Sequence, residues 1–418
     1  MERQKIEDFI FLTKDATDFL KEQPQQELAA KLREITFDRT ALLSMIHCEE
    51  QHYPEFMEIA DVWQQKADAL LVLGVGGSQA GTKAVIEALQ PKAMQVYFAG
   101  HGFSSHYLQG ILDRLTGKSV VVVVVSKSGN TTETLVTFGI IRNWLQATYG
   151  ADYAKRVLVV TGKKQNGGVL GNLADESGYR RFYVPDQIGG RYAMFTAVGL
   201  LPMAIAGVDI RQFLQGALAG EKAYAQQMDL TNPAVVYGYL RNALYRSGYT
   251  NELWVTYAPY LVDFGTWWRQ LFVESESKHG MGIYPVVAEY SNDLHYLGQY
   301  LRQGPRNIFE TVLWLEQPPA TLALDEDMAM LLGLPQGEDL TAIANMVKEE
   351  TRQAHKAAGV PQLSLTIPCL DPWQLGKLVV FFVQACLASS FLQGCNPFDQ
   401  PGVEAYKEQI SAALKSES

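Results

Sequence analysis

The run of six valines at positions 120–125 constrains the fold of this chain more than any other feature. The run has no polar alternation, so neither face of the segment is suited to water. Such a segment is typical of a central strand in a parallel sheet that helices cover on both sides. We therefore expect an α/β fold organised around this strand.

A polar stretch, residues 126–134 (SKSGNTTET), follows the valines and leads into a segment with helical apolar spacing. The start of a helix exposes backbone N–H groups and the positive end of the helix dipole, which together suit a phosphate. An ordinary N-cap is the alternative, but three hydroxyls and Lys127 around Gly129 exceed what a cap needs. We favour an oxyanion site here.

Apolar runs alternate with helical segments on both sides of this strand. Such alternation predicts right-handed βαβ units and two doubly wound α-β-α domains with parallel sheets. We predict N-terminal helices over 1–65, a first domain over 66–208, a second over 209–398 and a helical tail over 399–418. The first expected strand begins at Ala69. The other expected strands span residues 95–100, 120–125, 156–162, 180–185, 252–259, 307–316 and 362–370.

Composition excludes several classes of protein. The net charge of −10 argues against a general nucleic-acid or membrane-surface role, but not against a small anionic substrate. The four cysteines form neither a disulfide framework nor a paired metal motif, and the N-terminus lacks a secretory signal, so we expect a reduced, cytoplasmic protein. The uncharged stretch between Lys377 and Asp399 is long enough for a membrane span, but its polar residues favour a buried helix.

The glycine turn at 74–78 (GVGGS) follows the first strand and precedes a helix. A dinucleotide fingerprint fails here, because Gln79 stands where the third glycine belongs and no acidic residue ends the next strand. The turn still brings backbone amides and the Ser78 hydroxyl to the same sheet edge as residues 126–134. Two hydroxyl-rich turns without a nucleotide motif suggest a monophosphate on a small molecule.

Further candidates for chemistry lie outside these turns. Arg191 follows two glycines and precedes a buried helix, so it is expected to have a buried partner or a ligand rather than to lie on the surface. Glu274 follows aromatic and aliphatic residues, which favours burial and a general-base role, whereas Glu276 is expected to be exposed. In isolation, His295 and Lys407 carry little weight.

The segments LGVGGS, VSKSGNTTET, GGRY, VESES, NDLH and NPFDQPGVEAYK occur in the order found in glucose-6-phosphate isomerases. The chain resembles the compact bacterial members of this family from about Leu70 to Lys407. It departs from them at Ala193, where a serine or threonine is usual, and at Glu276, where an uncharged residue is usual. Asp293 and Leu294 also replace a Gly-Gln pair before the histidine.

The resemblance implies two sugar-isomerase (SIS) domains and a homodimer with a shared active site, to which the neighbouring subunit supplies the histidine. The implied reaction interconverts glucose 6-phosphate and fructose 6-phosphate through a cis-enediol, in glycolysis and gluconeogenesis. The implied phosphate ligands are Ser78, Ser126, Lys127, Ser128 and Thr131. The implied sugar ligands are Gly77, Gly190, Gln270 and Gln400, and the implied catalytic residues are Glu274, His295, Lys407 and Arg191.

In this mechanism His295 and Lys407 open the ring, Glu274 moves the proton between C2 and C1, and Arg191 stabilises the enediol charge. No step requires a metal or a redox cofactor, and the sequence offers no ligand set for one. Two alternatives remain: a non-catalytic sugar-phosphate sensor, and another aldose–ketose isomerase, such as one that acts on mannose 6-phosphate.

Overall fold

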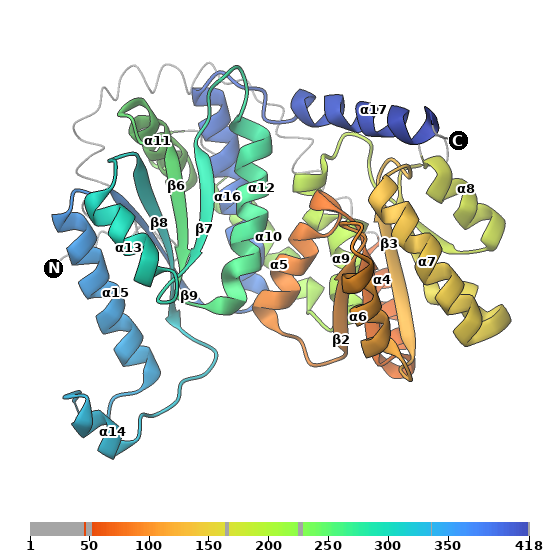
Figure 1. The fold of residues 1–418 in the computed structure, drawn as a ribbon, viewed down its shortest axis with the longest axis horizontal. Helices are drawn as coiled ribbons and strands as arrows, with labels where there is room; N and C mark the ends of the chain where they lie inside the picture. The colour runs from red at the N-terminus through yellow and green to blue at the C-terminus, as the bar shows by residue number, and fades with distance from the viewer. Residues whose placement is uncertain (1–45, 47–51, 164–166, 225–228, 336, 417–418) are drawn as a thin grey trace.

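Two parallel sheets, one in each half of the chain, organise the protein (Figure 1). The computed structural model describes residues 46, 52–163, 167–224, 229–335 and 337–416. Both sheets have helices on their faces, as the alternation of strands and helices predicts. The α/β class with parallel sheets is therefore confirmed, while the domain boundaries stay predictions.

The valine run forms β3 at the centre of the first sheet, whose strand order is β2-β1-β3-β4-β5. All of β3 is buried, and its alternate valines enter separate apolar clusters on the two faces of the sheet. This two-sided burial explains why the run has no polar alternation. The strands are β1 (Ala69–Leu73), β2 (Gln95–Ala99), β3 (Val120–Ser126), β4 (Val157–Thr161) and β5 (Arg180–Tyr183).

Helices alternate with the strands of this first half. Each expected strand is present within a few residues of its predicted position. The predicted helix in PQQELAAKLREI lies outside the described residues. The helices are α4 (Tyr53–Lys66), α5 (Ala80–Leu89), α6 (Ser105–Leu115), α7 (Thr132–Tyr149), α8 (Gly168–Ser177) and α9 (Ala197–Ala206).

The second sheet has the strand order β7-β6-β8-β9. Three of its strands were expected, but β7 was not, because it contains Pro285 and most of its residues are not fully buried. Proline lacks an N–H donor and is tolerated at a sheet edge, which is where β7 lies. The strands are β6 (Asn251–Thr256), β7 (Tyr284–Glu289), β8 (Ile308–Gln317) and β9 (Gln362–Cys369), with helices α12 (Val262–Glu276), α13 (Leu294–Gln303), α14 (Glu326–Leu331) and α15 (Leu340–Ala357).

The uncharged stretch near the C-terminus forms α16 (Pro372–Leu392), which packs against α10 (Ile210–Tyr224) and α11 (Pro233–Arg246). In the described residues, α16 is the one helix long and apolar enough to cross a membrane, but 94% of its apolar window is buried inside the fold. A core helix is therefore the better interpretation, as predicted. Cys386 and Cys395 are buried free thiols, and Cys48 lies outside the described residues.

The two halves meet where α5 packs against α12. An ion pair between Lys83 and Asp263, with Nζ 2.9 Å from Oδ1, joins these helices. The last helix, α17 (Pro401–Ser416), leaves the second half and extends across the first (Figure 1). The tail therefore reaches the carboxyl edge of the first sheet, where the predicted phosphate turns lie.

Candidate active site

A cleft of about 1150 Å³ opens where the first sheet, α12 and α17 meet. Ten of the thirteen predicted site residues line it, and Ser126, Arg191 and His295 do not. The cleft lies at the carboxyl edge of a parallel sheet, where open α/β folds bind their ligands. Its lining comprises Val75, Gly76, Gly77, Ser78, Lys127, Ser128, Asn130, Thr131, Thr132, Glu133, Asp186, Gly189, Gly190, Gln270, Glu274, Gln400, Val403, Tyr406, Lys407 and Ile410.

The loop after β3 forms one end of the cleft and leads directly into α7. Thr131 occupies the N-cap position of α7, yet its side chain makes no capping hydrogen bond. Its hydroxyl instead lies 2.8 Å from the hydroxyl of the buried Ser126. Ser126 thus orients the Thr131 side chain. Because that side chain does not cap α7, the backbone N–H groups at the start of the helix remain available to an anion.

The same loop is fixed by its neighbour, the loop after β4. Gly129 has a φ of +65°, and a Cβ there would lie 1.7 Å from the carbonyl oxygen of Gly167, so only glycine fits. Backbone hydrogen bonds run from Gly162 N to Lys127 O (2.9 Å) and from Leu170 N to Gly129 O (3.0 Å). The turn is therefore held on its far side and leaves its hydroxyls for the cleft.

The Lys127 side chain bridges this loop to the segment before Arg191. Its Nζ donates to the carbonyl oxygens of Asp186 (2.6 Å) and Ile188 (2.9 Å). Burial lowers the pKa of Lys127 below the usual lysine value, and the nearby Asp186 carboxylate opposes that shift. Lys127 lines the cleft, and its ammonium links the phosphate turn to the glycine–arginine segment.

The two glycine turns meet backbone to backbone. A Cβ on Gly77 would lie 2.3 Å from the carbonyl carbon of Gly190, so no other residue fits without moving one of the turns. We call this contact the glycine seam. It places the turn after β1, with Ser78, directly against the segment that carries Arg191.

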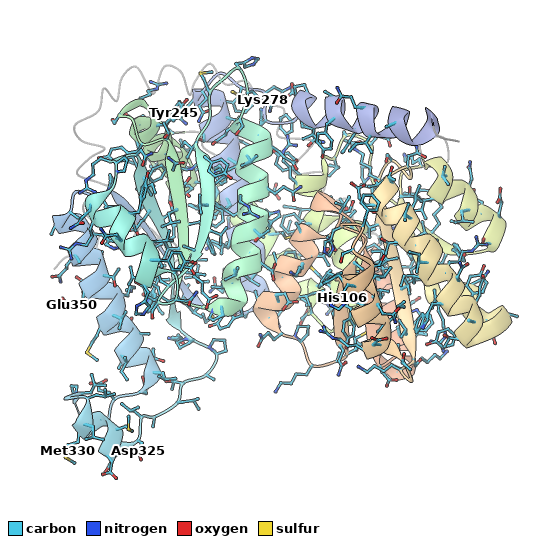
Figure 2. The ribbon with its side chains drawn as sticks, viewed as in Figure 1. His106, Tyr245, Lys278, Asp325, Met330 and Glu350 are labelled. Carbon is cyan, nitrogen blue, oxygen red and sulfur yellow. The ribbon has the colours of Figure 1, made fainter. Side chains whose placement is uncertain are left out.

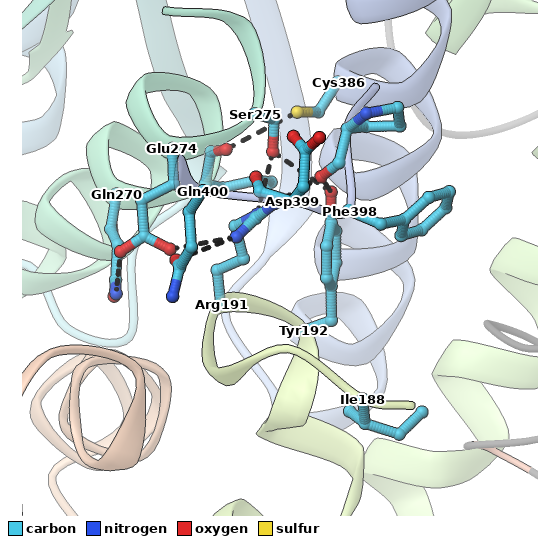
Figure 3. Close-up of polar contacts among 12 residues, drawn as sticks. Ile188, Arg191, Tyr192, Gln270, Glu274, Ser275, Cys386, Phe398, Asp399 and Gln400 are labelled. Atoms are coloured by element: carbon cyan, nitrogen blue, oxygen red, sulfur yellow. Dashed lines mark hydrogen bonds and ion pairs between the residues drawn. The ribbon is translucent and has the colours of Figure 1, made fainter. Parts of the chain in front are cut away.

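Glu274 lines the cleft from α12, where its carboxylate lies between Gln270 and Arg191 (Figure 3). Its Oε1 accepts a 2.7 Å hydrogen bond from Gln270 Nε2, one turn earlier on the helix. Its Oε2 lies 3.1 Å from Arg191 Nη1. The side chain is 19% exposed, so the carboxylate is held in a fixed orientation while it still reaches the cleft, as a general base requires.

Arg191 is only 1% exposed and lies behind the cleft rather than in it. A guanidinium has five N–H donors, and five acceptors in the protein surround this one (Figure 3). The prediction of a buried partner is thus confirmed, while contact with a ligand stays a prediction. The acceptors are Ser275 Oγ, Glu274 Oε2, Gln400 Oε1, Pro397 O and Asp399 O.

The prediction that Glu276 is exposed is wrong. Glu276 is fully buried, and its Oε1 lies 2.6 Å from Nη1 of Arg241, which also binds Glu252 at 2.6 Å. Burial raises the pKa of Glu276, and Arg241 opposes that shift. The helix turns about 200° between Glu274 and Glu276, so one carboxylate faces the cleft and the other the core.

The tail contributes Gln400 and, on α17, the exposed Lys407. Val403, Tyr406 and Ile410 lie on the same helix and give this side of the cleft an apolar wall. Their spacing of three and four residues, which places them on one helix face, was a signal available in the sequence. This apolar face was not predicted, because polar and charged residues stand between its members in the sequence.

His295 lies on α13, against the second sheet, and is exposed outside the cleft. This single chain therefore does not bring His295 to Glu274 or Lys407. Sequence reasoning also missed two acidic residues of the cleft, Glu133 and Asp186. Glu133 lies within the phosphate turn itself, where only the hydroxyls and Lys127 were weighed.

Within the described part of the chain, no three His, Cys, Asp or Glu side chains gather closely enough to hold a metal ion. What the cleft does offer is a hydroxyl-lined helix terminus at one end and an oriented carboxylate with a lysine at the other. This arrangement can hold a phosphate and move protons on the carbon chain attached to it.

Comparisons with known proteins agree with this geometry. The family model described as Phosphoglucose isomerase matches residues 36–305. A glucose-6-phosphate isomerase from Symbiobacterium thermophilum is 43% identical over 88% of this chain and 84% of its own length. One from Caldanaerobacter subterraneus is 42% identical over 84% of this chain and 80% of its own.

Two solved structures share the fold. A hypothetical protein from Thermus thermophilus superposes with a TM-score of 0.86 at 24% identity, over 97% of this chain and 99% of its own. A glucose-6-phosphate isomerase from Chlamydia trachomatis superposes with a TM-score of 0.76 at 21% identity, over 98% of this chain and 81% of its own. The matched segment spans the phosphate turn, the glycine seam and Glu274, and the identity to the bacterial relatives extends over most of the chain. This chain belongs to the phosphoglucose isomerase family.

Proposed function

We propose that the cleft interconverts glucose 6-phosphate and fructose 6-phosphate by proton transfer through a cis-enediol. The reaction is the one for which the family and the bacterial relatives are named, and it belongs to glycolysis and gluconeogenesis. The observation that carries the mechanism is the Glu274 carboxylate, held by Gln270 and Arg191 across the cleft from the phosphate turn.

The phosphate binds at the turn after β3. Ser78, Ser128 and Thr131 offer hydroxyl donors, Lys127 offers a positive charge, and the start of α7 adds its N–H groups and dipole. Ser126 acts indirectly: its hydroxyl contacts the Thr131 hydroxyl and orients it. This end binds substrate and transition state alike and fixes the distance to the reacting carbons.

Glu274 removes the C2 proton of the open-chain aldose and delivers it to C1, while the hydroxyl proton passes from O2 to O1. The carbonyl thereby moves from C1 to C2, and the reverse reaction retraces these steps. Gln270 and Arg191 bind the two carboxylate oxygens, so the base cannot rotate away from the cleft. Gly77, Gly190 and Gln400 also line the cleft and complete the sugar site.

Arg191 stabilises the enediolate through its field rather than through a free donor, because its five donors already have acceptors. Its charge is buried, so water screens it little. His295 and Lys407 open the ring as acid and base: the acid protonates the ring oxygen as its bond to C1 breaks, and the base takes the proton of the C1 hydroxyl, which becomes the carbonyl.

A homodimer supplies the missing histidine in this proposal. His295 is exposed on α13, remote from the cleft of its own chain, and the cleft exceeds the range of about 300–1000 Å³ typical of ligand pockets. A second subunit that inserts its α13 would both narrow the cleft and complete the acid–base set. We also place the enzyme in the cytoplasm.

A coupled assay with three substrates tests the activity. We expect turnover of glucose 6-phosphate and fructose 6-phosphate, with reduced or no activity on mannose 6-phosphate. Preferred turnover of mannose 6-phosphate would favour the related isomerase, and tight binding without turnover of any of the three would favour a sensor.

Mixing two inactive chains tests the shared site. In a dimer of Glu274→Gln and His295→Ala chains, one of the two sites has both residues intact. Random assembly after co-refolding should therefore recover about a quarter of the wild-type activity. If His295 serves its own chain instead, no mixture of the two variants recovers activity.

A further inference from the structure

Lys278 follows α12 by two residues and is not part of the cleft lining. Figure 2 shows it at the end of α12, close to where α17 begins. Its side chain is only 7% exposed, which is unusual for a lysine. Nothing in the mechanism above uses it.

The three N–H donors of its ammonium have three acceptors in the protein. One is the carbonyl oxygen of Ser275, 2.8 Å away on α12. The other two belong to the loop that follows α16: the carbonyl oxygen of Asn396, and Oδ1 of Asp399 at 3.0 Å. Lys278 thus bonds the helix that carries Glu274 to a loop more than a hundred residues further along the chain.

That loop, residues 396–400, is held from its other side by the glycine–arginine segment. Arg191 donates to the carbonyl oxygens of Pro397 and Asp399, and the Tyr192 hydroxyl donates to Pro397 O at 2.9 Å. Two cations therefore hold the loop between them: Arg191 from the cleft side and Lys278 from the end of α12.

The position of this loop determines where two residues of the proposed sugar site lie. Gln400 is its last residue, and α17 begins at Pro401 and carries Lys407 less than two turns later. A displacement of the loop by 1 Å moves both side chains relative to Glu274. Misplacement on that scale can cost about a hundredfold in rate.

We propose that Lys278 is a positioning residue, which holds the 396–400 loop and the start of α17 in register with Glu274. This inference rests on the proposed function, because it gives a role to Gln400 and Lys407. Lys278 touches neither the substrate nor the phosphate turn, so its effect is confined to the sugar end of the cleft.

The test replaces Lys278 with methionine, which keeps the aliphatic stem and removes the ammonium. The Asp399 side chain is 51% exposed and can be hydrated, so no buried charge loses its partner. We expect kcat to fall at least about tenfold. A hydroxamate analogue of the cis-enediolate should inhibit about tenfold less tightly, while competitive inhibition by inorganic phosphate should stay within about twofold of wild type.

The control is Arg156→Met. Arg156 is a half-buried cation that donates to Ser119 Oγ and Val120 O, each at 3.0 Å, at the opposite edge of the first sheet. Its loss should lower Tm without changing kcat, which separates positioning from general destabilisation. Asp399→Ala is a milder variant that removes the carboxylate but keeps the two carbonyl contacts of Lys278, and we expect a few-fold loss of kcat with normal phosphate inhibition.

Two outcomes overturn the inference: a normal kcat in Lys278→Met, or a parallel loss of phosphate inhibition and hydroxamate inhibition. If Lys278→Met does not fold, a normal kcat in Asp399→Ala overturns it. A wild-type chain that is inactive on both sugar phosphates contradicts the proposed function, whereas an active wild type with an unimpaired Lys278→Met contradicts the positioning role alone.

Discussion

The two ends of the cleft are built in opposite ways. The proposed phosphate end is largely one continuous segment, residues 126–134, and backbone hydrogen bonds to Gly162 and Leu170 fix it. The sugar end joins Arg191 to Glu274, 83 residues away, and to Gln400, 209 residues away. The phosphate end therefore depends on local structure, whereas the sugar end depends on how the two halves and the tail dock.

The largest effect is expected at the sugar end. Glu274→Gln keeps the shape of the side chain but removes the base, so kcat should fall about 10²–10⁴-fold. Steady-state kinetics with fructose 6-phosphate measure this loss, and inhibition by inorganic phosphate should be unchanged. Glu349→Gln, the same substitution on α15 away from the cleft, should leave kcat unaltered. Turnover near the wild-type rate in Glu274→Gln would remove Glu274 from the mechanism.

The glycine seam joins the two ends, so a substitution there should impair both. Gly77→Ala places a methyl group 2.3 Å from the backbone of Gly190, and the turns must separate. We expect kcat/KM to fall about a hundredfold, with KM raised and kcat lowered, as well as a lower Tm. Gly110→Ala in α6 meets no atom within 4 Å and should raise Tm slightly. A change in KM alone would show that the seam serves only the phosphate end.

Loss of one hydroxyl at the phosphate end should have a smaller and simpler effect. Ser128→Ala removes one donor to a charged phosphate, an interaction worth about 1.5–3 kcal/mol. We expect KM to rise at least about tenfold while kcat changes less than about threefold. Initial-rate measurements over a range of fructose 6-phosphate concentrations distinguish the two. A dominant loss of kcat would contradict the division of labour between the ends.

The smallest effect concerns pH. Burial favours the neutral form of Lys127 and lowers its pKa, and only the ammonium attracts the phosphate. As pH rises, kcat/KM should therefore begin to fall below the pH at which an ordinary lysine, with a pKa of about 10.4, loses its proton. In Lys127→Arg the decline should move to higher pH, because arginine stays protonated. The same alkaline profile in both proteins would assign the decline to another group.

The same contrast explains what the sequence could predict. The valine run and the hydroxyl-rich turn are local signals, and the structure places β3 and the turn as expected. β7 was not predicted because its partly exposed segment, which contains Pro285, has no strong apolar pattern. Local patterns suffice where one segment forms both the scaffold and the site.

Long-range partners account for the remaining differences. The burial of Glu276 depends on Arg241, 35 residues away, and its neighbours in sequence give no sign of this ion pair. The burial of Lys278 was not predictable for the same reason. Its acceptors Asn396 and Asp399 are distant in sequence and become its neighbours only in the folded chain. For Arg191 the sequence indicated a buried partner, but not which five acceptors would surround it.

The burial of α16 has a consequence for how the chain matures during synthesis. Its partners α10 and α11 are synthesised before it, and the faces that they pack against α16 stay uncovered until that helix follows. A nascent chain arrested before Pro372 would therefore expose an apolar surface of the kind that chaperones bind. Because the loop at 396–400 follows α16, the proposed sugar site can form only after that helix has been synthesised.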